Sequence, residues 1–337
     1  MIDADDAFVE EIETLGATLA EARRQVARRV IGQETVVELT LNALLCGGHG
    51  LLVGAPGLAK TRLVETLGRV MGLDAGRVQF TPDLMPADIL GAEVLEEAEH
   101  GGGRAFRFIE GPIFCQLLLA DEINRASPRT QSALLQAMQE RIVSVAGADR
   151  PLPAPFHVLA TQNPIEQEGT YPLPEAQLDR FLLQIDVDFP TLDAERAILL
   201  ATTGTEDAGA EPCFTAESLI AAQRLVRRMP VGESVMEAIL RLVRSARPGE
   251  PDASPTLAGA VAFGPGPRAA QALMLAVRAR ALLSQRLAPS VSDVEALARP
   301  ALKHRMALTF AARAEGRTLE QVIDGLVSEA LSLEEAA

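Results

Sequence analysis

The sequence predicts an α/β fold in which a parallel sheet is sandwiched between helices and is followed by a small all-helical region. Three short apolar runs, at 51–53, 117–120 and 158–161, read as buried strands because none of them alternates with polar residues. After Pro190 the apolar residues recur at spacings of three and four, which indicates helices. We therefore expect an α/β core over residues 1–190 and a helical domain over residues 191–337.

The size and composition of the chain limit its function. Its 337 residues, 48% of them hydrophobic, suffice for two or three domains with buried cores. A net charge of −15 argues against a broad nucleic-acid-binding surface, although a ring could still enclose a local basic pore. The three cysteines, Cys46, Cys115 and Cys213, lack the spacing of a zinc site or a disulfide framework. The N-terminal segment is acidic and no apolar stretch approaches ~18 residues, so we expect a cytoplasmic protein without membrane insertion.

Two helices are expected before the first strand. Residues 5–28 carry apolar side chains at spacings of three and four, and a second helix is expected over 34–46. The residues between them are Val30, Ile31, Gly32 and Gln33. Either Gly32 only forms a turn, or Val30 and Ile31 pack against the ring of a ligand, and spacing alone leaves both possibilities open.

A glycine-rich loop follows the first apolar run. Its sequence, GAPGLAKT at 54–61, stands between a predicted strand and a helical pattern, which is the context that a phosphate-binding loop requires. The backbone N–H groups of such a loop converge on a polyphosphate, and the positive end of the new helix dipole adds to the attraction. Lys60 would reach the β- and γ-phosphates, and the Thr61 hydroxyl would hold Mg²⁺. The residues expected to bind the phosphates are Gly54, Ala55, Pro56, Gly57, Leu58, Ala59, Lys60, Thr61 and Arg62.

One position of this loop departs from the usual pattern, because Ala59 stands where a glycine is expected. We expect Ala59 to begin the helix with a negative φ, so that its methyl group is tolerated. The alternative is an accidental Gly/Pro loop between a strand and a helix.

The segment after the loop helix predicts a further strand at 78–80 and then a hairpin-like insertion between residues 92 and 109. The glycines at 101–103 would form the tip of this insertion, and His100 beside them would be a solvated loop residue.

Two carboxylates end the second apolar run, at Asp121 and Glu122. The C-terminal edge of a parallel sheet is where such folds bind ligands, and two acids are costly to bury there without cations. Asp121 would join the Mg²⁺ shell, and Glu122 would orient and deprotonate an attacking water. The alternative is a strand that ends in two solvated acids.

A helix over 127–141 and a second hairpin over 142–157 are expected before the third apolar run. Asn163 follows that run, and its amide could hold the water or a γ-phosphate oxygen. A residue that only forms a turn is the alternative at this position.

Six motifs occur in a characteristic order along the chain. They are VIGQE at 30–34, GAPGLAKT at 54–61, LLLADEINRA at 117–126, ATQNP at 160–164, PLPEAQLDRF at 172–181 and GPGPRA at 264–269. Together they closely resemble the MoxR family of AAA+ ATPases over nearly the whole chain. The alanine before the loop lysine is itself typical of this family.

The resemblance implies an AAA+ P-loop NTPase core that binds ATP and Mg²⁺, with a helix-2 insert at 92–109 and a pre-sensor-1 hairpin at about 142–157, followed by a small helical lid. It also implies that Val30, Ile31 and Gln33 contact the nucleotide base. Asn163 matches sensor 1.

Two arginines acquire roles from the same resemblance. Arg180 matches the arginine finger that is offered to a neighbouring subunit, and Arg268 matches sensor 2 at the start of a lid helix. The transition state of phosphoryl transfer spreads negative charge over its oxygens, which a guanidinium stabilises. Alternatively, Arg180 could be an ion-pair partner of Asp179, and Arg268 could only pack on the core. Arg125 is a second candidate for the subunit interface.

The helical region is expected to contain helices at 219–229, 235–246 and 268–284, with a Pro/Gly/Ser-rich loop at 247–264. Ser290 with Asp293, and Thr318 with Gln321, have capping-box spacing and predict two further helices. This region would cover the nucleotide and move with the phosphate state.

The function implied by the resemblance is that of an ATP-hydrolysing chaperone ring, with six subunits expected. It would work with a separate von Willebrand factor A protein and mature a metalloenzyme or a membrane complex. A nucleotide-gated scaffold with little turnover and a magnesium-chelatase-like motor subunit are the alternatives.

Overall fold

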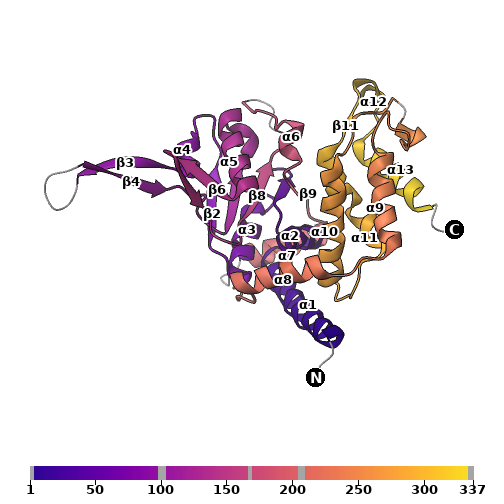
Figure 1. The fold of residues 1–337 in the computed structure, drawn as a ribbon, viewed down its shortest axis with the longest axis horizontal. Helices are drawn as coiled ribbons and strands as arrows, with labels where there is room; N and C mark the ends of the chain where they lie inside the picture. The colour runs from indigo at the N-terminus through magenta and orange to yellow at the C-terminus, as the bar shows by residue number, and fades with distance from the viewer. Residues whose placement is uncertain (1–3, 98–103, 166–168, 204–208, 258, 333–337) are drawn as a thin grey trace.

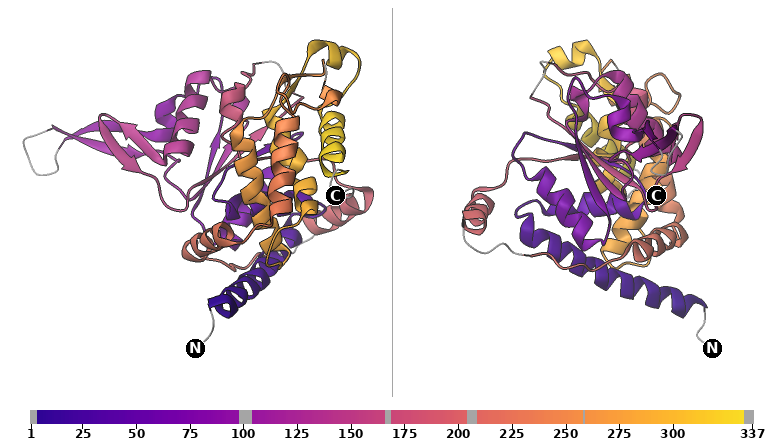
Figure 2. Two further views of the ribbon diagram at one scale, coloured as in Figure 1. Left: turned by 45° about the vertical axis from the view of Figure 1, so that its right-hand side comes forward. Right: turned by 90° about the vertical axis from the view of Figure 1, so that its left-hand side faces the viewer.

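A computed structural model describes residues 4–97, 104–165, 169–203, 209–257 and 259–332 of the chain. Figure 1 shows helical C-terminal elements at one end of the molecule and an arm formed by two strands at the other. The long first helix, α1 (Ala4–Arg29), runs along the lower edge in both views of Figure 2.

The centre of the core is a parallel sheet with the strand order β2-β5-β8-β1-β9. The strands are β1 (Gly50–Val53), β2 (Ala75–Gln79), β5 (Leu117–Asp121), β8 (His157–Gln162) and β9 (Leu183–Asp186). The predicted parallel sheet is therefore confirmed, and the three apolar runs are its strands β1, β5 and β8. Strand β9 was not predicted, because Gln184 and Asp186 interrupt its apolar residues and leave no continuous apolar run.

Both faces of this sheet are buried, as the uninterrupted apolar runs predicted. Leu117 and Leu119 of β5 belong to a core cluster shared with α1, α2 (Glu34–Leu45), α3 (Lys60–Val70) and the C-terminal helices. Leu118 and Ala120 point to the other face, into a cluster shared with α5 (Pro128–Glu140). The α/β sandwich follows from this alternation.

Two hairpins extend the core beyond the central sheet. The first consists of β3 (Gly91–Glu97) and β4 (Arg104–Glu110), which form the arm in Figure 1 and follow the short helix α4 (Pro86–Leu90). Its expected tip, His100 and the glycines at 101–103, lies outside the described residues. The second, β6 (Ile142–Val145) with β7 (Ala148–Pro151), is shorter than the predicted 142–157, because it ends at Pro151 and the proline-rich residues 152–156 form no strand.

The C-terminal region is helical, as predicted. Its helices are α7 (Leu192–Thr203), α8 (Ala216–Arg228), α9 (Glu233–Ser245), α10 (Pro267–Leu283), α11 (Val291–Leu302), α12 (Phe310–Ala314) and α13 (Leu319–Ser332). Both capping boxes are formed: the Ser290 N–H donates to Asp293 Oδ2 over 2.8 Å, and the Thr318 N–H donates to Gln321 Oε1 over 3.1 Å.

One detail of this region differs from the prediction of an all-helical lid with a loop at 247–264. Two very short strands, β10 (Val261–Phe263) and β11 (Ala307–Leu308), pair in antiparallel fashion within it. They were not visible in the sequence because two or three residues carry no period. The boundary at residue 190 stays a prediction. Within the described residues, no helix combines the length and the apolar character needed to span a membrane.

Candidate nucleotide-binding site

The glycine-rich loop lies where its motif predicts, between β1 and α3, at the C-terminal edge of the sheet. Gly54 is packed so closely that a Cβ atom there would lie 2.4 Å from the Val187 carbonyl oxygen, so only glycine fits. Gly57 has a φ of +83°, which other residues rarely adopt. The turn thus needs both glycines of the motif.

The expectation for Ala59 is wrong. Its φ of 57° and ψ of 20° place it in the left-handed region, and it is the N-cap of α3, so the helix begins one residue later than we expected. The methyl group is accommodated at a cost of about 1–2 kcal/mol rather than in a relaxed helical conformation. A glycine at this position would avoid that cost, which explains why the usual pattern has one.

Lys60 already binds the loop that would hold the phosphates. Its Nζ atom donates to the carbonyl oxygens of Gly54, over 2.5 Å, and Ala55, over 3.2 Å. Burial lowers the pKa of Lys60, and the nearby carboxylates of Asp121 and Glu122 oppose that shift. The ammonium group therefore stands inside the loop, in the field of both acids.

A cavity of about 400 Å³ adjoins this loop. It is lined by Arg28, Arg29, Ile31, Gln33, Gly57, Leu58, Ala59, Arg62, Pro190, Ile198, Ala201 and Thr202. Ile31 and Gln33 thus lie beside the loop, as a base-contacting role requires, and Gln33 Nε2 donates to the Asp188 carbonyl oxygen over 3.1 Å. Val30 does not line the cavity, because its side chain is buried in the hydrophobic core. Gly32 forms a turn with a φ of +73°.

The two acids at the end of β5 are held by different partners. Asp121 Oδ1 accepts a hydrogen bond from Thr161 Oγ1 over 2.7 Å, and Asp121 Oδ2 forms an ion pair with Arg77 Nη2, also at 2.7 Å. Thr161 also accepts the N–H of Glu122 over 2.8 Å, so one buried hydroxyl fixes both residues.

Glu122 has a left-handed backbone, with a φ of 57°. Its Oε2 atom accepts from Gln79 Nε2 over 2.7 Å and from Arg125 Nη1 over 3.0 Å. Arg125, which we expected to be a candidate interface residue, is thus the ion-pair partner of Glu122 within the chain. The alternative of two solvated acids is not observed, because each makes specific contacts.

Sequence reasoning missed three of these residues: Arg77, Gln79 and Thr161. Arg77 and Gln79 stand two residues apart on β2, and the register places Gln79 opposite Asp121. The alternation of polar residues on β2 is visible in the sequence, but only the pairing of β2 with β5 shows that these residues lie beside Asp121 and Glu122.

Asn163 is buried and follows β8. Its Oδ1 atom accepts the N–H of Ile165 over 3.1 Å, which is the turn considered as the alternative. That bond uses the amide oxygen, so the amide NH₂ remains the group that can donate to a phosphate or a water.

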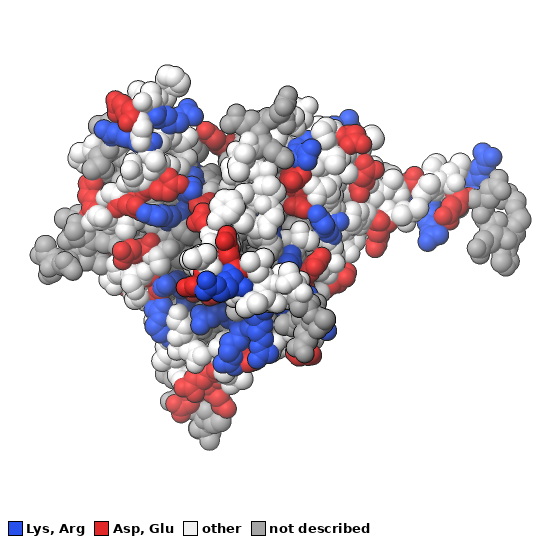
Figure 3. Space-filling view, turned by 180° about the vertical axis from the view of Figure 1, so that it is seen from behind, with Lys and Arg blue, Asp and Glu red and all other residues white. Residues whose placement is uncertain are grey.

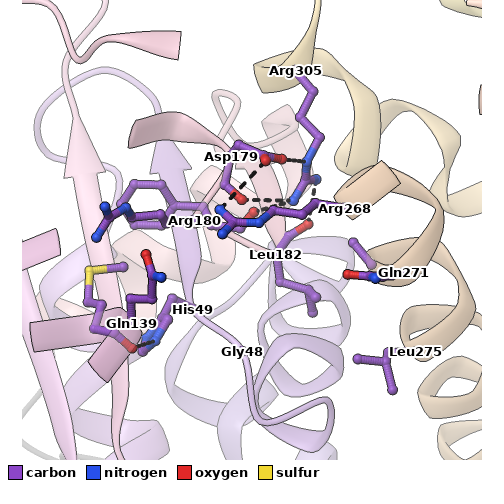
Figure 4. Close-up of a pocket in the computed structure, with 13 residues that line it drawn as sticks. Gly48, His49, Gln139, Asp179, Arg180, Leu182, Arg268, Gln271, Leu275 and Arg305 are labelled. Carbon is purple, nitrogen blue, oxygen red and sulfur yellow. Dashed lines mark hydrogen bonds and ion pairs between the residues drawn. The ribbon is translucent and has the colours of Figure 1, made fainter. Parts of the chain in front are cut away.

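Arg180 and Arg268 lie in a second cavity, of about 250 Å³, which none of the glycine-loop residues lines (Figure 4). Arg268 is the second residue of α10, and its side chain is 51% exposed and lies 3.8 Å from Asp179. Arg180 Nη1 donates to the Leu135 carbonyl oxygen. The alternative of an Arg180–Asp179 ion pair is not observed, because Asp179 pairs with Arg268 and, at 2.7 Å, with Arg305.

The side chains expected to hold Mg²⁺ offer the kind of ligand atom that this ion binds. Asp121 and Thr61 offer oxygen atoms, which Mg²⁺ prefers, and Mg²⁺ needs only one or two protein ligands when phosphates supply the rest. Within the described residues, no group of three or more His, Cys, Asp and Glu side chains forms a metal site that would favour another ion.

Comparison with known proteins decides the family. Residues 49–183 match the model of the ATPase family associated with various cellular activities (AAA), and residues 257–326 match that of an AAA lid domain. Chaperone MoxR1 of Mycobacterium tuberculosis is 42% identical over 307 residues, which cover 91% of this chain and 80% of that protein. The chain belongs to the MoxR family of AAA+ ATPases.

Other MoxR relatives agree over similar lengths. Protein MoxR of Paracoccus denitrificans is 33% identical, with 83% of this chain and 86% of that protein covered. A crystal structure from Cytophaga hutchinsonii superposes with a TM-score of 0.85 at 34% identity and covers 94% of this chain and 96% of that one. A nucleotide-binding AAA+ core followed by a helical lid is therefore the shared framework of this MoxR protein.

Proposed function

We propose that this MoxR protein hydrolyses ATP with Mg²⁺ in a homo-oligomeric ring, in which each active site lies between two subunits. The observation that carries the proposal is the separation of the two cavities. The loop residues Gly57, Leu58 and Ala59, directly before Lys60, line one of them, and Arg180 and Arg268 line the other, which shares no residue with the first. Guanidinium groups that lie apart from the glycine-rich loop of their own chain can contact a bound nucleotide only if a second copy of the chain places its loop beside them.

The residues of the glycine-rich loop and of the neighbouring strand ends have distinct roles in this proposal. The loop N–H groups and Lys60 hold the phosphates, Thr61 and Asp121 would hold Mg²⁺, and Glu122 orients and deprotonates the attacking water. Bound Mg²⁺ neutralises charge that develops on the phosphate oxygens. Asn163 donates its amide NH₂ to the water or to a γ-phosphate oxygen.

The second cavity supplies the remaining charge. Arg180 acts as the finger toward the neighbouring nucleotide, and Arg268 as a sensor from the same side. A finger of this kind contributes roughly 10³-fold or more in rate.

Mixed rings test this arrangement. Arg180→Ala chains should hydrolyse ATP on the order of 10³-fold more slowly than the wild type. An excess of Lys60→Ala chains should restore part of the rate, because each variant supplies what the other lacks. An absence of recovery in rings that are shown to contain both chains would refute a finger that acts across the interface.

The proposed task of the ring is to remodel protein complexes together with a von Willebrand factor A protein, in the maturation of a metalloenzyme or a membrane complex. The relative from Mycobacterium tuberculosis carries the name of a chaperone, which supports the remodelling part. Nucleic acid is a poor alternative because the net charge is −15. The face in Figure 3 has basic side chains gathered in its lower middle, but acidic side chains are spread over much of the rest of it.

A partner that receives work from the ring must bind its nucleotide states with different affinities. Glu122→Gln chains with ATP should therefore capture such a protein from native lysate, whereas the same chains with ADP should not. Equal capture in both states, or capture of mainly DNA-associated proteins, would contradict this task. A steady-state ATPase assay separates the motor from the two alternatives, a nucleotide-gated scaffold and a magnesium-chelatase-like subunit, since the scaffold would hardly turn over.

A further inference from the structure

The short helix η3 (Lys303–Arg305) holds the segment that carries Arg180. Arg305 Nε donates to Asp179 Oδ1 over 2.7 Å, and its two terminal nitrogens donate to the carbonyl oxygens of Phe181 (2.7 Å) and Leu182 (3.0 Å). Further bonds join Arg305 to the carbonyl oxygens of Ala301 and Asp179, at 2.6 and 3.5 Å. All five N–H donors of this guanidinium are thus in use.

The neighbours of Arg305 on η3 bind the same stretch of the core. His304 Nε2 donates to the Phe181 carbonyl oxygen over 3.0 Å, and Lys303 Nζ pairs with Asp186 at 2.7 Å. We call η3 with its contacts to residues 179–186 the η3 clasp. It joins elements that are more than a hundred residues apart in the chain.

Burial distinguishes the η3 clasp from an ordinary surface ion pair. The Arg305 side chain is 4% exposed, whereas that of Arg268 is 51% exposed. A buried guanidinium with every donor satisfied has one orientation, and removing its partner would leave an uncompensated charge. Arg305 therefore holds the backbone of residues 179–182 in one position.

The position it fixes is that of both interface arginines. Arg180 stands between Asp179 and Phe181, which Arg305 binds on either side. Arg268 approaches the second oxygen of the same Asp179 carboxylate (Figure 4). One carboxylate, oriented by Arg305, thus adjoins the backbone of the finger and the side chain of the sensor.

We propose that Arg305 and Asp179 are positioning residues, which set Arg180 and Arg268 for the nucleotide of the neighbouring subunit. This inference rests on the proposed function, since it requires that the two arginines act across an interface. It gives the helical region a second role besides covering the nucleotide. Both η3, through Arg305, and α10, through Arg268, contact Asp179 next to Arg180.

Two substitutions test the role in the full-length chain. Asp179→Asn removes the carboxylate charge but keeps the size of the side chain and the carbonyl bonds of Arg305. Arg305→Lys keeps the charge but has three donors instead of a planar fork of five. The matched control is Arg299→Gln, which breaks an exposed ion pair with Asp324 inside the lid and leaves the finger segment untouched.

Each variant is measured alone and with an excess of Lys60→Ala chains. Alone, Asp179→Asn and Arg305→Lys should bind a fluorescent ATP analogue as tightly as the wild type, but hydrolyse ATP on the order of tenfold more slowly, as expected for lost charge-assisted bonds. In mixed rings, hydrolysis should recover, because the Lys60→Ala neighbour provides an intact finger to the variant's own loop. Arg299→Gln should hydrolyse at the wild-type rate.

The outcomes separate a positioning role from a merely structural one. A wild-type rate for both variants alone would overturn the inference, and so would a slow rate that mixing does not restore while Arg180→Ala mixtures do recover. If Arg180→Ala mixtures also fail in verified mixed rings, the proposed function falls and the positioning role falls with it. If Arg305→Lys does not fold, Asp179→Asn decides alone.

Discussion

The two cavities hold their charged side chains in opposite ways. Around the glycine-rich loop beside the first cavity, three charged groups make contacts that a ligand could replace: Lys60 binds carbonyl oxygens of its own loop, Asp121 pairs with Arg77, and Glu122 pairs with Arg125. At the second, the buried Arg305 is saturated with bonds. The glycine-rich loop and its neighbouring acids, the loop side, can therefore exchange partners when a ligand binds. The cavity lined by Arg180 and Arg268, the arginine side, instead presents charges whose positions are fixed.

The largest expected effect separates binding from chemistry at the first cavity. Glu122→Gln should reduce ATP hydrolysis by about 10²–10⁴-fold and leave ATP bound, because it removes a base and not a phosphate contact. Lys60→Ala should instead weaken ATP binding itself. Titration with a fluorescent ATP analogue and single-turnover hydrolysis measure the two effects. Hydrolysis at the wild-type rate by Glu122→Gln would show that the assignment of the base is wrong.

The next effect concerns the histidines on the arginine side. His49 lines the second cavity, His304 belongs to the η3 clasp, and His157 lies near His49 in the core. Burial lowers the pKa of His49 and His304 to about 3 and that of His157 to about 4, with the charges of His157 and Arg305 adding to the shifts of His49 and His304 respectively. Each is thus neutral when folded but takes up a proton near pH 6.5 when unfolded.

Stability contributed by these histidines is complete above pH 6.5 and is lost as the pH falls toward 4, since the unfolded chain binds more protons there. At pH 5 each costs about 2 kcal/mol of unfolding free energy. Urea denaturation between pH 7 and pH 5 measures the loss. His304→Gln retains a donor for the Phe181 carbonyl oxygen and should flatten the profile by the share of one histidine. A profile that stays flat in the wild type would contradict the buried neutral state.

The smallest effect tests whether the contacts at the first cavity are exchangeable. Arg77→Gln removes the cation that competes with Mg²⁺ for Asp121, so ATP binding should need less Mg²⁺, by up to about fivefold, as expected for a half-exposed ion pair. Arg107→Gln, which breaks an exposed pair with Glu96 on the arm, is the matched control. If Arg77→Gln needs more Mg²⁺ than the control, Arg77 supports the metal site and does not compete with it.

The sequence could predict the first cavity far better than the second. A loop, its lysine and two acids are recognisable because each motif is local and follows an apolar run. Even there, the predicted conformation of Ala59 was wrong, because the motif alone does not reveal whether this residue begins the helix or caps it. Val30 was placed at the ligand, but packing against the core decides its position.

The second cavity could not be predicted in the same way. Asp179 and Arg305 are separated by 126 residues, and no spacing rule relates them. The same holds for Thr161, whose hydroxyl links Asp121 and Glu122 only after β5 and β8 pair. Resemblance supplied Arg180 and Arg268, but only the fold shows that they share a cavity apart from the loop.

A structure of the Glu122→Gln protein with ATP and Mg²⁺, determined by electron cryomicroscopy, tests the central claim most directly. The account predicts a ring in which Arg180 and Arg268 of one subunit lie within hydrogen-bond reach of the phosphates held by Lys60 of the next. A monomer with ATP bound, or a ring in which both arginines reach the nucleotide of their own chain, would contradict it.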